Sequence, residues 1–176
     1  MDDKKRIIVA LDYDNIDDAL TLIDSIDPSL CRVKIGKELF SKYGPLIVGN
    51  VKNKGFEIFL DLKFHDIPTT IYKACVSAFS LDIWMLNIHL SGGLNMALSA
   101  MKAKEDVRST TQLIGVTALT SLSDKDCLSI YGVSRSEQVR RFKQIGQHAD
   151  IDGYVCSAND IISVSYTHLT LPTNGT

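Results

Sequence analysis

The chain has 176 residues, 45% of them hydrophobic and 23% charged, with a net charge of −2. This size and composition fit a single globular domain with its own core. The charge gives no basis for expecting nucleic acid or membrane binding, and no apolar run approaches the roughly 20 residues that span a bilayer.

The cysteines and the N-terminus indicate a cytoplasmic protein. The apolar run before Asp12 is too short for a signal peptide. No C-x-x-C pair occurs, so we expect neither a zinc nor a redox motif. We expect reduced, buried structural thiols of a cytosolic protein, with a catalytic cysteine as the alternative. The four cysteines are Cys31, Cys75, Cys127 and Cys156.

Six short β-type segments alternate with segments of helical spacing. The expected strands are 6–12, 31–36, 56–63, 83–90, 112–120 and 151–158. The expected helices are 15–26, 69–79, 92–104 and 136–149, the last with Ser136 as its N-cap. Near-continuous apolar strands of this kind indicate a parallel sheet covered by helices. An open doubly wound sheet and a (β/α)8 barrel both fit, and both place the ligand site at the carboxyl ends of the strands.

Charged side chains end three successive strands of the predicted sheet. Asp61 and Lys63 share one face of the third strand, while Asp12 ends the first and Lys34 lies on the second. A solvated rim with incidental ion pairs is the alternative, but four charges on three neighbouring strands favour a site that handles protons. There Lys63 could act as a general acid and Asp61 would repel a substrate anion. Such a cluster suits loss of a negative group and protonation of a carbanion.

Other candidate groups give weaker signals. His65 is expected to pack or to make a supporting hydrogen bond, and His89 could either do the same or act in the site. Gly92 and Gly93 could cradle a phosphate, but we expect a tight strand-to-helix turn. The sequence has no G-x-G-x-x-G after the first strand and no G-x-S-x-G, and no His, Asp and Glu set has convincing metal spacing.

Five segments then point to one enzyme family. In chain order they are VALDYDN, RVKIGKELF, FLDLKFHDIP, HLSGG and VTALTS. With them, residues 6–159 resemble the orotidine 5′-phosphate decarboxylases of bacterial type. The resemblance implies a (β/α)8 TIM barrel, of which about six of the eight βα units are present. It implies decarboxylation of orotidine 5′-monophosphate to UMP in de novo pyrimidine biosynthesis, with no metal and no organic cofactor.

The resemblance also implies a role for each site residue. Lys63 would deliver a proton to carbon 6 of the pyrimidine, and Asp61 would lie against the substrate carboxylate. Lys34 and Asp66 would complete the charged array, with Asp66 supplied by the partner subunit of a homodimer. Asp12 and Lys34 would hold the ribose hydroxyls. The other substrate-binding positions would be Ile67, Pro68, Thr69, Thr70 and Thr120.

Two rival functions stay open. Sugar-phosphate decarboxylases and hexulose-phosphate synthases of the same barrel superfamily share D-x-K-x-x-D but use magnesium and an enediolate intermediate. The HDIP segment after Lys63 favours the orotidine enzyme, as does Lys34 in place of an acidic residue. The second rival is a non-catalytic barrel remnant that binds a partner or dimerises.

The C-terminal part of the chain departs from the family. The phosphate-gripping loop and the G-x-R-P motif do not occur in the sequence, although such barrels usually bind phosphate after strands seven and eight. We interpret residues 1–160 as a partial barrel domain and 161–176 as a non-native tail on a truncated frame, with a divergent genuine tail as the alternative. We therefore expect the chain alone to be poorly soluble or molten, with unpaired sheet edges, and slow in decarboxylation.

Overall fold

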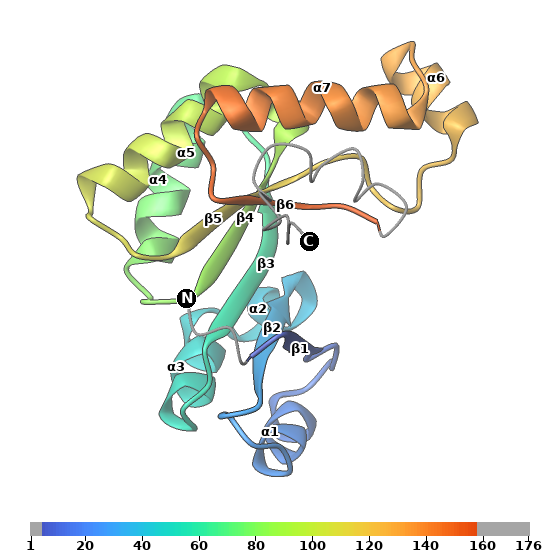
Figure 1. Cartoon of the computed structure of the whole chain (residues 1–176). Helices are drawn as coiled ribbons and strands as arrows, with labels where there is room; N and C mark the ends of the chain where they lie inside the picture. The colour runs from blue at the N-terminus through green and yellow to red at the C-terminus, as the bar shows by residue number, and fades with distance from the viewer. Residues whose placement is uncertain (1–4, 158–176) are drawn as a thin grey trace, which may run out of the picture.

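The structure is a computed structural model that describes residues 5–157. Six parallel strands form one sheet in the order β1-β2-β3-β4-β5-β6, and the sheet curls with helices along its outer side (Figure 1). The six predicted strands are thereby confirmed, while the predicted tail at 161–176 lies outside the described residues. The strands are β1 (Ile7–Ala10), β2 (Cys31–Gly36), β3 (Ile58–Phe64), β4 (Met85–His89), β5 (Gln112–Val116) and β6 (Gly153–Val155).

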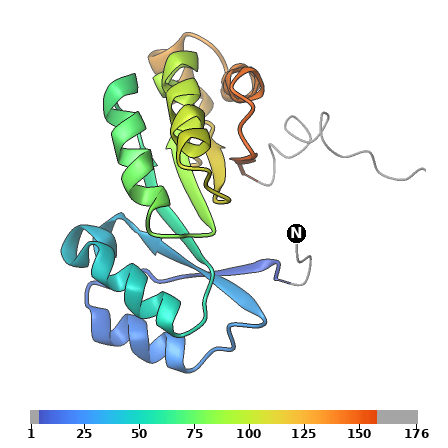
Figure 2. The same cartoon turned by 90° about the vertical axis from the view of Figure 1, so that its left-hand side faces the viewer.

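The helices fall into two groups on either side of β3 (Figure 2). The first group lies beside β1 and β2 and comprises α1 (Ile16–Asp24), α2 (Lys37–Tyr43) and α3 (Pro45–Asn53). The second lies beside β4, β5 and β6 and comprises α4 (Pro68–Phe79), the 3-10 turn η1 (Leu90–Gly92), α5 (Leu94–Asp106), α6 (Asp124–Tyr131) and α7 (Arg135–His148). The four predicted helices are confirmed, and α2, α3 and α6 are additional.

The start of α7 corrects the predicted N-cap. Ser134, not Ser136, caps this helix, and its side chain accepts a hydrogen bond from the backbone amide of Glu137 at 3.3 Å. Ser134 and Glu137 stand at the S-x-x-E spacing of a capping box, which would have identified the correct serine. Ser136 lies inside the first turn of the helix.

The hydrophobic core lies between the sheet and its helices. Val33 and Ile35 of β2 and Leu86 and Ile88 of β4 are fully buried there. Strand alternation turns the residues between them, including Asn87, to the inner face of the curled sheet. The outer face therefore forms the main core, while the inner face carries polar side chains such as Asn87 beside buried apolar ones such as Ile114.

One irregularity interrupts the sheet between β3 and β4. Leu60 pairs with Leu86, but the next matched pair is Phe64 with Ile88, so β3 carries extra residues at this point. Lys63 lies in that bulge with a φ of 51°, a left-handed conformation that is uncommon outside glycine. Bulges and strained backbone of this kind are frequent beside functional sites.

The two outer strands leave the sheet open. Among the described strands, β1 pairs only with β2 and β6 pairs only with β5. Ile7 and Ile8 of β1 are 64% and 40% exposed. The predicted unpaired edges and exposed apolar residues are confirmed for this part of the chain, and the low solubility expected from them stays a prediction.

The cysteines are mainly core residues, as predicted. Cys31, Cys75 and Cys127 are buried, and Cys156 is partly exposed. Burial raises the pKa of Cys75 to about 12, which keeps that thiol protonated and unreactive. Within residues 5–157, no helix is long and apolar enough to cross a membrane.

Candidate active site

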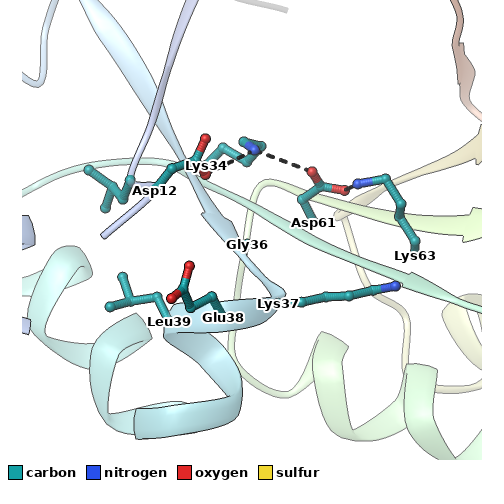
Figure 3. A pocket seen from close by; sticks show the side chains of 9 residues that line it. Asp12, Lys34, Gly36, Lys37, Glu38, Leu39, Asp61 and Lys63 are labelled. Atoms are coloured by element: carbon teal, nitrogen blue, oxygen red, sulfur yellow. Dashed lines mark hydrogen bonds and ion pairs between the residues drawn. The ribbon is translucent and has the colours of Figure 1, made fainter. Parts of the chain in front are cut away.

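Four charged side chains form a row at the carboxyl ends of β1, β2 and β3 (Figure 3). Lys34 Nζ lies 3.4 Å from Asp12 Oδ1 and 3.5 Å from Asp61 Oδ2. Lys63 Nζ lies 2.5 Å from Asp61 Oδ1. The charges thus alternate in sign along the row, and the predicted convergence of these four residues is confirmed.

Strand register explains how residues so distant in sequence meet. Lys34 pairs with Ala10 of β1 and with Phe59 of β3, and Asp61 follows Phe59 on the same face. Asp12 extends beyond the end of β1 by the same two-residue step. Parallel strands therefore deliver all the charges to one edge of the sheet.

Asp61 is the most buried member of the row, with 8% of its surface exposed. Burial alone would raise the pKa of its carboxyl. Hydrogen bonds from Lys63 and Asn87, with the charges of Lys63 and Lys34, outweigh burial and hold the pKa below its ordinary value. Asp61 therefore stays a carboxylate at neutral pH although it is largely shielded from water.

Asn87 is a site residue that the sequence analysis missed. Its side-chain Nδ2 donates to Asp61 Oδ1 at 2.6 Å, and its Oδ1 accepts the backbone amide of Lys63 at 2.8 Å. The sequence signal was a single amide inside the apolar run WMLNIHL. Such an amide needs hydrogen-bond partners when buried, and here both partners belong to the charged row.

A cavity of about 270 Å³ opens beside this row. The four residues of the row line it (Figure 3). The other lining residues are Leu11 after β1, Gly36 at the end of β2, and Lys37, Glu38 and Leu39 in the first turn of α2. Lys37 and Glu38 were not predicted as site residues. The cavity is below the roughly 300–1,000 Å³ typical of ligand sites, so a ligand of ordinary size would extend past it.

The two histidines lie next to each other near the site. The ring centroids of His65 and His89 are 5.6 Å apart. Burial, followed by the charges of His65, Lys37 and Lys63, lowers the pKa of His89. His89 is therefore neutral at pH 7, and the two roles considered for it stay open.

The predicted segment Asp66–Thr70 lies outside the cavity. All five residues are exposed. Asp66 Oδ1 accepts the backbone amide of Ile67 at 2.7 Å. Pro68 and Thr69 instead line a second surface cavity, whose other residues are Tyr72, Lys73, Ser99 and Lys102 on α4 and α5. The structure thus does not bring Asp66 into the charged row of its own chain.

Thr120, the remaining predicted contact, is exposed in the turn after β5 and does not line the cavity. The Gly92–Gly93 pair forms the tight strand-to-helix turn expected of it. A side chain on Gly92 would collide with Met96, and Gly93 has a φ of 83°. Within residues 5–157 no group of three or more His, Cys, Asp or Glu side chains is arranged to hold a metal ion.

A parallel sheet that curls, with its strands in chain order and its helices outside, is the arrangement of the α/β-barrel enzymes, whose active sites lie at the carboxyl ends of the strands. Residues 5–171 match the model of the orotidine 5′-phosphate decarboxylase / HUMPS family, and the chain belongs to this family. That match extends into the segment predicted as a tail, so the domain boundary at residue 160 stays a prediction.

Relatives with assigned names agree with the family. The orotidine 5′-phosphate decarboxylase of Saccharophagus degradans is 47% identical over 160 residues, which cover 90% of this chain and 67% of that one. The enzyme of the same name from Pseudomonas fluorescens strain Pf0-1 is 48% identical over 168 residues, covering 94% and 72%. The chain therefore spans about two thirds to three quarters of these relatives.

Solved structures confirm the predicted fold class. Orotidine 5′-phosphate decarboxylase from Lactobacillus acidophilus superposes with a TM-score of 0.83 at 33% identity, over 93% of this chain and 76% of that one. An uncharacterized conserved protein from Geobacillus kaustophilus gives 0.82 at 30% identity, over 90% and 77%. The six described strands thus correspond to part of a barrel.

Proposed function

We propose that this chain carries the catalytic array of an orotidine 5′-monophosphate decarboxylase, which forms UMP and CO2. The observation that carries the proposal is the Lys63 ammonium held 2.5 Å from the Asp61 carboxylate at a cavity that Lys34 also lines. The names of the relatives support the substrate.

The geometry suggests how the reaction would proceed. A substrate carboxylate placed beside Asp61 would be repelled by it, and loss of CO2 would remove that repulsion. The bond between carbon 6 and the carboxylate would break, leaving its electron pair on carbon 6. Lys63 would then deliver a proton to that carbon, while its positive charge stabilises the developing carbanion.

Lys34 and Asp12 would bind the ribose. Lys34 spans the gap between the Asp12 and Asp61 carboxylates, so its position is fixed from both sides. The Asp12 side chain is 70% exposed and can accept hydrogen bonds from sugar hydroxyls. Lys34 also weighs against the magnesium-dependent rival, since those enzymes would have an acidic residue at this strand position.

We further propose that the active unit is a homodimer in which Asp66 enters the partner's site. Asp66 is exposed and lies outside the cavity of its own chain. Ile67 beside it is 64% exposed, which is a large apolar surface for a residue at the start of α4. A two-fold dimer places the same patch on both subunits, so one contact would serve both sites.

The function is tested by release of labelled CO2 from carboxyl-labelled orotidine 5′-monophosphate. We expect release by the 176-residue chain and none above background from Lys63→Ala. Lys54→Ala is the matched control, because Lys54 also lies 2.5 Å from an aspartate, Asp24, but on the far surface. Equal release by the chain and Lys63→Ala would contradict the proposal.

The dimer is tested by mixing two inactive variants, Lys63→Ala and Asp66→Ala. In a mixed dimer, one site would combine Lys63 of one chain with Asp66 of the other and would be complete. We expect activity to appear on mixing, together with a dimer mass by light scattering. No recovery in a mixture shown to contain mixed dimers would contradict the crossing of Asp66.

A further inference from the structure

Asn87 occupies an unusual place for a polar side chain. It is only 1% exposed, in the middle of β4 between Leu86 and Ile88, which are both fully buried. A buried amide costs free energy unless it is hydrogen-bonded. Both of its hydrogen-bond partners, Asp61 and Lys63, are members of the charged row, so this buried amide links the row to the middle of the sheet.

The first partner is the main chain of Lys63. The ladder between β3 and β4 breaks after Leu60, which takes the Lys63 amide out of regular pairing. The Asn87 Oδ1 accepts that amide at 2.8 Å and so replaces a backbone carbonyl. The bond thereby stabilises Lys63 in a left-handed backbone conformation, which is unfavourable for a residue other than glycine.

The second partner is the Asp61 carboxylate. Asn87 Nδ2 and Lys63 Nζ both approach Oδ1, at 2.6 and 2.5 Å. The other oxygen, Oδ2, is left facing Lys34 at 3.5 Å. The amide therefore fixes which oxygen of Asp61 serves which lysine.

We propose that Asn87 is a positioning residue of this site, whose single amide fixes both the Asp61 carboxylate and the main chain that carries Lys63. The inference deepens the proposed decarboxylation and rests on it for the purpose of the array. Asn87 does not line the cavity, so it acts through Asp61 and Lys63 and not on the substrate.

Two substitutions separate the two bonds. Asn87→Ala removes both. Asn87→Asp keeps an oxygen that accepts the Lys63 amide but replaces the donor to Asp61 with a second carboxylate. When the introduced carboxyl is protonated, it can donate to Asp61 again. Thr111→Val is the control, because Thr111, just before β5, is a buried polar residue at 2% exposure whose hydroxyl donates to the Ile83 carbonyl, away from the site.

The first measurement is the titration of the Asp61 carboxyl by carbon-13 NMR in the 176-residue chain. We expect Asn87→Ala to raise the proton affinity of Asp61 by about tenfold or more, as loss of a charge-assisted hydrogen bond would. In Asn87→Asp the two carboxyls should titrate as a coupled pair. Thr111→Val should leave the Asp61 titration unchanged. If Asn87→Ala fails to fold, Asn87→Asp carries the test.

The second measurement is kcat against pH. We expect Asn87→Asp to lose about tenfold or more at pH 7 and to recover as the pH falls, with KM little changed. An unaltered Asp61 titration in the Asn87 variants would overturn the positioning role. A shifted titration in a chain whose turnover does not depend on Lys63 would instead uphold that role and refute the decarboxylase, so the two failures are distinguishable.

Discussion

Two basic residues of β2, Arg32 and Lys34, share the inner face of the sheet but belong to very different surroundings. Arg32 is 4% exposed, and its guanidinium lies 4.0 Å from the centre of the Trp84 ring. Its Nε is 3.2 Å from Glu57 Oε2, and its Nη1 donates to the Lys5 carbonyl. Lys34, two residues on, lies between two carboxylates and lines a cavity.

The difference shows what separates a structural ion cluster from a candidate site. Arg32 is stacked on Trp84 and ion-paired with Glu57, although its buried Nε makes no hydrogen bond among the described residues. The row of Asp12, Lys34, Asp61 and Lys63 instead opens onto space that a ligand can enter. Strand ends of α/β barrels differ in the same way, with catalysis at the carboxyl end and stability at the other.

The largest expected effect is on turnover and comes from changing the charged row at the carboxyl ends of the strands. Asp61→Asn should lower kcat by about a hundredfold or more, because it removes the charge that repels the substrate carboxylate and orients Lys63. Steady-state assays against the unsubstituted chain would measure this. A kcat within a few-fold of the parent would show that the row is no more catalytic than the Arg32 cluster.

Arg32→Ala should instead lower the stability of the fold and leave turnover unchanged. It removes a stacked guanidinium and its half-buried ion pair with Glu57, and we expect the free energy of unfolding to fall by about 2 kcal/mol. Turnover per folded molecule should be unchanged. Urea unfolding gives the first quantity, and kcat corrected for folded fraction gives the second. Loss of kcat with unchanged stability would show that the Arg32 cluster is not structural, and would contradict its contrast with the charged row.

A smaller effect on stability is expected when only the stacking of Arg32 on Trp84 is removed. Trp84→Leu keeps an apolar side chain but removes the ring under Arg32. We expect the free energy of unfolding to fall by about 1 kcal/mol. Combining it with Arg32→Ala should cost less than the sum of the two, because the residues interact directly. Strictly additive losses in the urea midpoints would show that the ring and the guanidinium do not cooperate.

The smallest expected effect concerns pH. Folding lowers the pKa of Asp61 below its model-peptide value of 3.8, so the folded state binds this proton less readily than the unfolded state. The resulting stability is present above that pH and is lost as the pH falls through the folded pKa. Asp61→Asn should flatten this part of the curve of unfolding free energy against pH. An identical acid slope in both proteins would contradict the pKa shift.

The sequence predicted best those site residues whose position depends mainly on strand alternation. Lys34 and Asp61 followed from a two-residue period, because parallel strands align their ends. Lys63 was predicted from the same period and does meet Asp61, but it lies in the bulge of β3, which the sequence did not indicate. Asn87 did not, since its role depends on the shift of register after Leu60, which depends on packing between two strands. The family resemblance named Asp66, but a single chain cannot show which site an exposed carboxylate enters.

The helices divide similarly. Those with a long apolar stripe, such as α1 and α5, were predicted from spacing. The short α2 and α3 are separated only at Gly44, whose φ of 57° turns the chain between them. Two brief helices in succession give no single periodicity, and the pattern of residues 37–53 therefore predicts no helix.

The strand order has a consequence for how the protein forms. Each strand pairs with the one before it in the chain, so the sheet contains no strand that must wait for a later one to be inserted between neighbours. Pairing of this sequential kind keeps the chain between paired strands shorter than in a sheet with inserted strands, and so limits the loop-closure entropy. We expect a nascent chain to add its βα units in order as they leave the ribosome, with the newest strand always serving as the growing edge.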